Sequence, residues 1–197
     1  MMKMEMGILL PCVWTTLAQD LISPTIDILA ELKKIKTMEE KLNALNDEVR
    51  ELRSKNEERA KVAFSASLSS SAGVKYFGPY AEAITLVYEN VLTNIGNAYD
   101  TNTGVFTAPV KGVYFFNFVV FNPHDISTGV KLLKNGTLVV AASDNPPGQD
   151  TEDTTCNSVS LILEQGDQIR LQLIENRHIY TDALRRNTFS GHLLFTM

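Results

Sequence analysis

The 197-residue chain is poor in cysteine, because Cys12 and Cys156 are its only two, and a network of disulfides therefore cannot hold it together. Its eleven glycines are far too few for a collagen triple helix, which needs glycine at about every third residue. No apolar run approaches the roughly 20 residues of a membrane-spanning helix, so we expect no membrane span. The net charge is −5, and no block of Lys and Arg occurs, which argues against nucleic acid as a partner.

Aromatic residues are absent between Thr15 and Ala63, whereas all nine Phe and all six Tyr occur from Phe64 onward. Residues 31–61 are instead rich in charge, with eight acidic and nine basic residues. This change in composition predicts a boundary near Lys61. We expect a segment without aromatic residues over 19–60 and a globular head over 61–197.

The first eighteen residues contain a Lys, a short apolar stretch and a small-residue end at Ala18. This pattern is typical of a secretory signal peptide, so residues 1–18 are predicted to be removed and the protein to be secreted and extracellular. The alternative is an amphipathic start that stays buried in the protein. Cleavage would leave Cys156 as the only cysteine, either as a small buried hydrophobe or as an intermolecular bridge.

Within the segment 19–60, apolar residues recur at alternating spacings of three and four, the a and d positions of a heptad: Ile35, Met38, Leu42, Leu45, Val49 and Leu52. Charged and polar residues occupy the flanking positions, which predicts an α-helical coiled coil that follows Pro24. The heptads leave the number of chains open, and a solvated single helix is the alternative.

After Val62 the helical period ends, and short alternating apolar segments recur between turn signals, which predicts an all-β sandwich or jelly roll. Asn135-Gly136 and Gly166-Asp167 mark two hairpin turns. The segment 113–121 is apolar on both faces, with Tyr114, Phe116, Phe118 and Val120 on one and Val113, Phe115, Val119 and Phe121 on the other. We expect a neighbouring subunit to cover the second face.

Three separated motifs in the head resemble the C1q domain family. The spacing of its signature is reproduced by Asn94, Tyr99, Phe106, Gly112, Tyr114, Phe116 and Phe118, although Tyr88 stands where the family has Phe. Residues 163–169 resemble the penultimate hairpin of that family, and residues 187–195 resemble its closing strand. With its helical segment and no collagen stalk, the chain is similar to short secreted C1q-like and cerebellin-like proteins.

The resemblance implies a ten-stranded jelly roll like that of tumour necrosis factor, assembled as a homotrimer. It also implies an extracellular binding protein rather than an enzyme, with a microbial surface, a glycan or a receptor as its ligand. Innate immunity and intercellular signalling are both compatible with this function. The alternative is a structural scaffold in which helix and head build higher oligomers.

No catalytic or zinc-binding motif organises the three histidines, His124, His178 and His192, so we expect no catalytic residues and no required cofactor. Residues 143–153 contain four carboxylates. The resemblance to calcium-binding relatives implies one ligand at Asp153 and another at Asn145, so Asp153 and Asp144, the carboxylate next to Asn145, are the candidate Ca²⁺ ligands. A solvated acidic loop is the alternative.

Asn135-Gly136-Thr137 is a glycosylation sequon as well as a plain hairpin turn, so Asn135 is a candidate glycosylation site. A basic loop near the end of the chain contains Arg177, Arg185 and Arg186, together with His178 and Tyr180. This loop is predicted either to contact an acidic or sugar ligand or to be ordinary surface.

Overall fold

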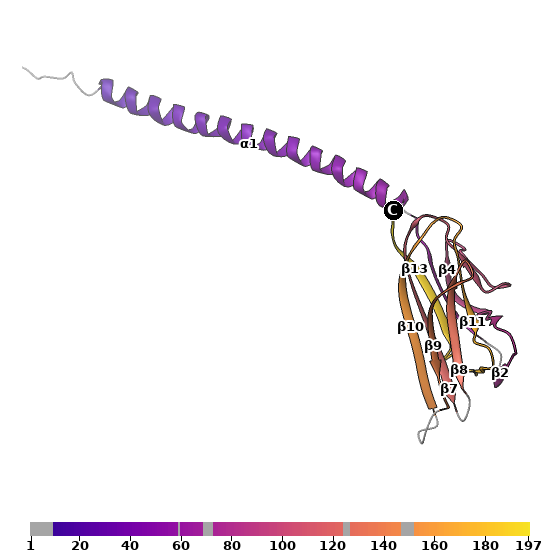
Figure 1. Ribbon diagram of the computed structural model, residues 1–197. Helices are drawn as coiled ribbons and strands as arrows, with labels where there is room; N and C mark the ends of the chain where they lie inside the picture. The colour runs from indigo at the N-terminus through magenta and orange to yellow at the C-terminus, as the bar shows by residue number, and fades with distance from the viewer. Residues whose placement is uncertain (1–9, 59, 69–72, 124–126, 147–151) are drawn as a thin grey trace, which may run out of the picture. The chain divides into compact units, whose positions relative to one another are not determined.

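The computed structural model describes residues 10–58, 60–68, 73–123, 127–146 and 152–197, with helical side chains described only over 28–56. The chain divides into two compact units, residues 1–58 and 59–197. The first contains the only helix of the described residues and the second contains the strands (Figure 1). Residues 1–9 of the expected signal peptide lie outside the described residues, and so do the side chains of 10–18.

The helix α1 spans Leu10–Glu58. The helix that the heptads predict is therefore confirmed over residues 28–56, but α1 begins well before Pro24, so the expectation that the helix follows this proline is wrong. All six seam residues are exposed in the single chain, from Val49 at 38% to Met38 at 61%. Pairing of this seam with other chains stays a prediction.

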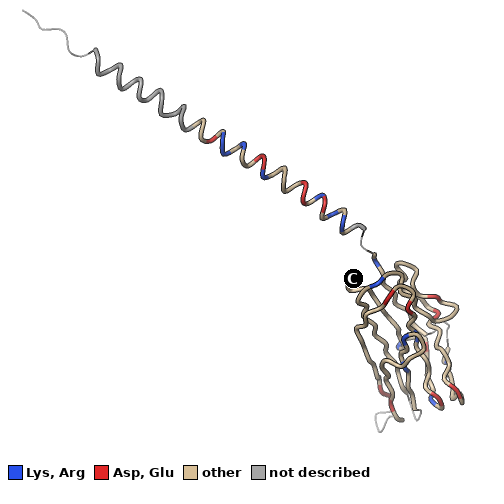
Figure 2. Tube along the Cα trace, turned by 45° about the horizontal axis from the view of Figure 1, so that its top comes forward, with Lys and Arg blue, Asp and Glu red and all other residues tan. Residues whose placement is uncertain are grey.

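Oppositely charged residues one turn apart pair along the surface of α1. Lys34 Nζ lies 2.7 Å from Glu31 Oε1, and Lys55 Nζ lies 2.6 Å from Glu51 Oε1. Figure 2 shows the two signs interleaved along the described part of the helix. Such exposed pairs each stabilise a helix by only about 0.3–0.5 kcal/mol. They therefore keep the helix soluble more than they hold it together.

The second unit is a sandwich of two antiparallel sheets. The five-stranded sheet has the order β10-β7-β13-β1-β4, and the six-stranded sheet has the order β5-β6-β11-β8-β9 with β3 paired to β11. A separate pair consists of β12 and β2. The bounds are β1 (Ala63–Ser67), β2 (Lys75–Phe77), β3 (Ile84–Thr85), β4 (Asn90–Ile95), β5 (Tyr99–Asp100), β6 (Val105–Thr107), β7 (Gly112–Pro123), β8 (Thr128–Lys134), β9 (Thr137–Asp144), β10 (Glu152–Leu163), β11 (Gln168–Leu173), β12 (Ile179–Thr181) and β13 (Thr188–Thr196).

The predicted jelly-roll sandwich is confirmed. The described residues contain thirteen strands, whereas the resemblance implies ten. Five of the thirteen are only two or three residues long, and the other eight form most of the two sheets. The predicted turns at Asn135-Gly136 and Gly166 are present, with positive φ at each of these residues.

The core is a layer of aromatic rings between the two sheets. The alternating burial of β7 turns Tyr114, Phe116 and Phe118 inward, each with no exposed surface. On β1, the Phe64 ring stacks 4.8 Å from the Tyr99 ring and meets the Phe189 ring edge-on, also at 4.8 Å. These contacts join strands that are far apart in the sequence.

Gly191 on β13 lies beneath this aromatic layer. A Cβ atom at Gly191 would lie 2.5 Å from the Phe116 ring and 2.7 Å from the Phe64 ring. No side chain fits there, because cores are close-packed and both rings belong to buried residues. The glycine of the closing motif is therefore a packing requirement.

Most residues of the signature have structural roles. The Asn94 side chain closes the turn before β5, because its Nδ2 donates to the Tyr99 carbonyl at 2.8 Å and its Oδ1 accepts from the Tyr99 N–H at 3.3 Å. The Tyr99 hydroxyl accepts from the Tyr88 N–H at 2.9 Å, and burial raises the pKa of Tyr99 to about 12. The signature thus identifies the scaffold and not a binding site.

Tyr88 departs from the signature by one hydroxyl group. The residue is fully buried, and its own hydroxyl has no hydrogen-bond partner among the described residues. Burial raises the pKa of this phenol, and the nearby Tyr99 raises it further. An unpaired buried polar group costs about 1–3 kcal/mol.

Replacing Tyr88 by Phe removes the unpaired hydroxyl without removing the ring, so Tyr88→Phe should raise the free energy of unfolding by about 1 kcal/mol or more. Tyr114→Phe is the matched control. The Tyr114 hydroxyl donates to the Val110 carbonyl at 2.8 Å, so its removal should lower the free energy of unfolding by about 1 kcal/mol. Thermal unfolding of both variants checks the prediction, which is wrong if both lose stability.

Candidate functional site

The outward face of the five-stranded sheet is apolar at one end. Val113 on β7 pairs with Ile162 on β10 and with Phe195 on β13, so the three side chains form one row across the sheet. Ile162 is 56% exposed and Phe195 is 58% exposed. A row of large apolar side chains thus faces solvent in the single chain, which is the usual property of a surface that another molecule covers.

The neighbouring rows of this face are uncharged. Phe115 lies between Ser160 and His192, and its ring lies 5.5 Å from the imidazole of His192. Further rows contain Asn117, Val119, Ser158, Cys156, Ser190 and Thr188. Across these rows on β10, β7 and β13, all within the described residues, there is no Lys, Arg, Asp or Glu. We call this surface the uncharged face.

Part of the expectation for the segment 113–121 needs correction. Phe121 is only 4% exposed, and the guanidinium of Arg186 from the same chain lies 3.3 Å above its ring centroid. The cover of Phe121 is therefore intramolecular. Val113, Phe115 and Val119 are half-buried between their neighbouring strands, so the exposed apolar area lies mainly on the adjacent strands β10 and β13.

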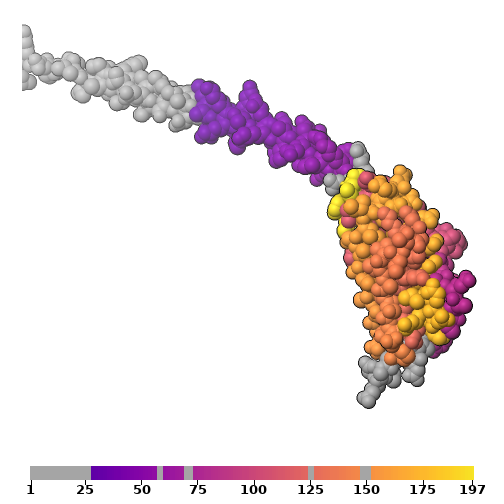
Figure 3. All heavy atoms as spheres, in the orientation of Figure 1, coloured from indigo at the N-terminus to yellow at the C-terminus, as the bar shows by residue number. Residues whose placement is uncertain are grey.

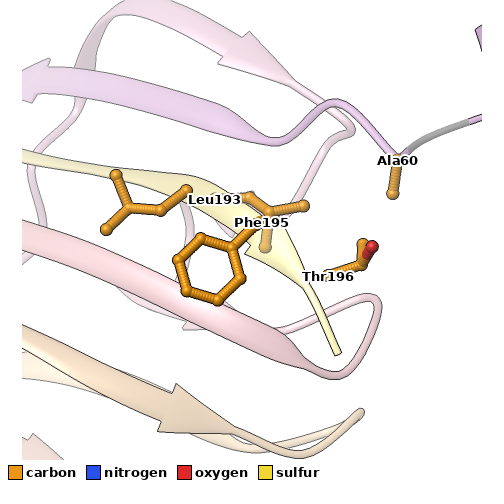
Figure 4. Close-up of a pocket in the computed structure, with 5 residues that line it drawn as sticks. Ala60, Leu193, Phe195 and Thr196 are labelled. Atoms are coloured by element: carbon orange, nitrogen blue, oxygen red, sulfur yellow. The ribbon is translucent and has the colours of Figure 1, made fainter. Parts of the chain in front are cut away.

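A small pocket of about 160 Å³ lies at the apolar end of β13. It is lined by Ala60, Leu193, Leu194, Phe195 and Thr196 (Figure 4). Binding sites for drug-sized molecules usually enclose about 300–1,000 Å³. The pocket is therefore too small for such a ligand, and it is better suited to receive one side chain.

The two candidate calcium ligands lie at the same end of the sandwich. Asp144 is the last residue of β9 and Asp153 the second residue of β10, while residues 147–151 between them lie outside the described residues. Asp153 pairs across the sheet with the buried Asn122, whose Nδ2 donates to the Asn145 carbonyl at 3.1 Å. The structure thus brings both segments to Asn122.

The side chains around Asn122 fit a cation that prefers oxygen ligands, such as calcium, only in part. The Asn122 Oδ1 is buried and has no partner in the described part of the chain. The Asp144 carboxylate lies one residue before Asn145, whose N–H donates to Asp144 Oδ1 at 2.9 Å. However, no group of three or more Asp, Glu, His or Cys side chains gathers among the described residues. Calcium takes six to eight oxygens, so these side chains would hold it only with backbone oxygens and water.

Asn135 is exposed at the tip of the β8–β9 turn, with φ of 50°. Its Nδ2 donates to Asp167 Oδ1 at 2.8 Å, and its Oδ1 accepts from the Gln168 N–H at 2.8 Å. Lys134 and then Asn135 lower the pKa of Asp167 to about 2. The turn is therefore pinned to the neighbouring turn, and one Nδ2 proton of Asn135 stays outside these bonds.

The histidines and arginines of the sequence analysis do not form one cluster. His124 lies outside the described residues, while His192 is on the uncharged face and His178 bonds Thr128 through its backbone carbonyl. Arg177 donates to the Asp144 carbonyl at 2.9 Å. Arg186 pairs with Asp182 and Glu152, so only Arg185 of the three arginines is exposed.

Sequence reasoning missed two of these features. The contact of Arg186 with Phe121 and the convergence on Asn122 both join segments that are distant in the chain, and no local spacing signals either of them. The sequence predicted the uncharged face only in part, since the alternation of one strand shows its own outward residues but not which strands lie beside it.

In the described part of the chain, no helix is apolar enough over a sufficient length to cross a bilayer.

Comparisons with known proteins agree on one domain type. The model of the C1q domain matches residues 63–194. Complement C1q tumor necrosis factor-related protein 3 from Mus musculus is 37% identical over 136 residues, which cover 68% of this chain and 51% of that protein. The chain thus spans about half the length of this relative.

Two solved structures show the same fold. The globular domain of zebrafish complement 1qA protein matches with a TM-score of 0.51 and 20% identity, covering 70% of this chain and 100% of that chain. Murine APRIL matches with a TM-score of 0.53 and 10% identity, covering 68% of this chain and 99% of that chain. At these identities the likeness extends to the fold alone.

Proposed function

The chain belongs to the C1q-domain family, and on this premise we propose that it is a secreted recognition protein that assembles as a homotrimer and binds an extracellular ligand. C1q-domain and tumour-necrosis-factor-like proteins bind ligands and are not enzymes. The ligand is a microbial surface, a glycan or a receptor, in innate immunity or intercellular signalling.

The uncharged face carries this proposal. Exposed Ile162 and Phe195 favour burial, because each Å² of apolar surface removed from water contributes about 25 cal/mol. No carboxylate or ammonium on the rows from Val113 to Val119 has to be desolvated when another copy covers them. A closed ring of three heads hides three such faces at once and leaves no open interface.

The exposed heptad seam of α1, in the first unit of the chain, also supports assembly of several copies. Its a and d side chains are exposed in the single chain, and parallel helices would bury them against each other. Three identical heads carried together present three equivalent ligand sites. Weak single contacts then give strong overall binding, because the second and third contacts form within one assembly.

A charge on the uncharged face should break the assembly of heads. We expect the wild-type protein to show three times the mass of one chain in light scattering. Ile162→Asp, combined with Leu45→Lys to weaken the helix seam, should raise the concentration needed for assembly at least tenfold, since each contact between heads would have to bury a carboxylate. Leu138→Asp with Leu45→Lys is the control, because Leu138 is 59% exposed on the other sheet.

Equal masses for these two variants would contradict assembly through the uncharged face. The scaffold alternative predicts a different result for the wild type. Its mass would exceed three chains, and arrays of glycans, microbial surfaces and receptor ectodomains would show no binding. A trimer that binds on such an array agrees with recognition.

Calcium at Asp144 and Asp153 remains part of the proposal, supported by their place beside the unpartnered Asn122 oxygen. Millimolar CaCl₂ should raise the Tm of the wild type by about 5–11 °C over EDTA, because a ligand present at 100 times its Kd stabilises by about 2.7 kcal/mol and each kcal/mol raises the Tm by about 2–4 °C. Asp144→Asn with Asp153→Asn should abolish this shift, whereas Asp100→Asn should retain it. An unchanged shift in the double variant would assign calcium elsewhere.

Glycosylation at Asn135 follows from secretion and from the exposed turn. Protein secreted from eukaryotic cells should lose mass on treatment with peptide-N-glycosidase. Thr137→Ala is the sharpest comparison, since it destroys the sequon but keeps the bonds of Asn135 to Asp167 and Gln168. The same loss of mass in this variant, or none in the wild type, would reject the site.

A further inference from the structure

The loop between β12 and β13, residues 182–187, holds an apolar side chain out in water. Leu184 is 71% exposed, more than any other large apolar residue in the described head, and Ala183 and Arg185 beside it are also exposed. The chain around β12 lies at the surface beside β2 (Figure 3, yellow-orange next to purple). We call Leu184 and Arg185 the loop tip.

The base of this loop is firmly held by Asp182. Its Oδ1 accepts the Leu184 N–H at 3.0 Å, and its backbone carbonyl accepts the Arg185 N–H at 3.3 Å. Its second carboxylate oxygen pairs with the guanidinium of Arg186. These three bonds define a tight turn that restricts the loop tip.

The following residues anchor the loop to the core. The Arg186 guanidinium lies over the Phe121 ring and within 3.7 Å of Glu152. Asn187 is 1% exposed, and its Oδ1 accepts the Phe121 N–H at 2.9 Å while its Nδ2 donates to the Tyr180 carbonyl. The loop is therefore preorganised, and little entropy is lost when it binds.

Arg185 adopts a backbone conformation that disfavours a bulky side chain. Its φ is 57°, in the left-handed region where glycine or asparagine is preferred. The fold thus leaves the apolar Leu184 side chain in water, and it holds the Arg185 backbone in a conformation that arginine disfavours. The exposed Leu184 and the strained Arg185 lie in one preorganised loop, which indicates a functional contact because backbone strain gathers at binding sites.

The charges around the loop indicate the partner. Asp182 and Glu152 already pair with Arg186, whereas none of the described carboxylates pairs with Arg185. Tyr76, which is 53% exposed, meets the Tyr180 ring edge-on at 5.2 Å and adds exposed aromatic surface on β2, the strand paired with β12. A partner must therefore offer an apolar pocket with a carboxylate at its rim.

We propose that the loop tip is the ligand contact of the head, with Leu184 inserted into an apolar pocket of a receptor ectodomain and Arg185 paired with a carboxylate at its rim. The inference rests on the proposed recognition function and names its residues. Three loop tips in one trimer would contact three receptor chains.

The test uses the full-length protein on an array of purified receptor ectodomains. For ectodomains that bind the wild type, Leu184→Asp should weaken binding at least tenfold and Arg185→Glu by a similar factor. The control is Leu138→Asp, because Leu138 is 59% exposed on β9 of the six-stranded sheet; this change should alter binding less than twofold. Arg185→Gly should raise the Tm by about 2–4 °C by relieving the strain, yet weaken binding.

Four results would overturn the proposal, and they differ in meaning. Ectodomains that bind the wild type and Leu184→Asp equally leave recognition intact but place it elsewhere on the head. No binding by the wild type removes the recognition function itself. A lower mass of Leu184→Asp in light scattering makes the loop tip a contact between copies, and Leu184-dependent binding to phosphatidylserine vesicles makes it a membrane contact.

Discussion

Both sheets of the head close on one layer of aromatic rings, and the position of every other surface follows from this layer. Phe64 touches rings from β5, β6, β7 and β13, so strands from both sheets share one centre. Because successive side chains of a strand point to opposite faces, the residues next to those that pack on these rings point outward. The exposed row of Ile162 and Phe195 is the reverse side of the same packing.

This coupling separates residues that identify the family from those that act for it. Asn94, Tyr99 and Gly191 are recognisable in the sequence because the core tolerates few replacements at their positions. Leu184 and Arg185 lie on a surface loop that the scaffold only has to support. A family of recognition proteins can therefore keep its core residues and change its ligands through loops such as 182–187.

The sequence predicted the parts that depend on local pattern. The seam of the helix and the turns at Asn135-Gly136 and Gly166-Asp167 could be read from periodicity and turn chemistry, and the two apolar faces of 113–121 were correctly noticed. The cover of Phe121 was not predictable, because Arg186 reaches it from the loop between β12 and β13, which is distant in the sequence. The unpaired hydroxyl of Tyr88 was equally hidden, since sequence shows a substitution but not whether a partner lies within reach.

The order of strands has a consequence for the folding of the head. β13 follows all the other described strands in the sequence, yet it lies between β7 and β1 in the middle of its sheet. Until β13 is in place, β7 and β1 each have an unpaired backbone edge, and Phe64 lacks the Phe189 ring. A partly folded head without β13 would therefore expose an open sheet that can pair with other chains.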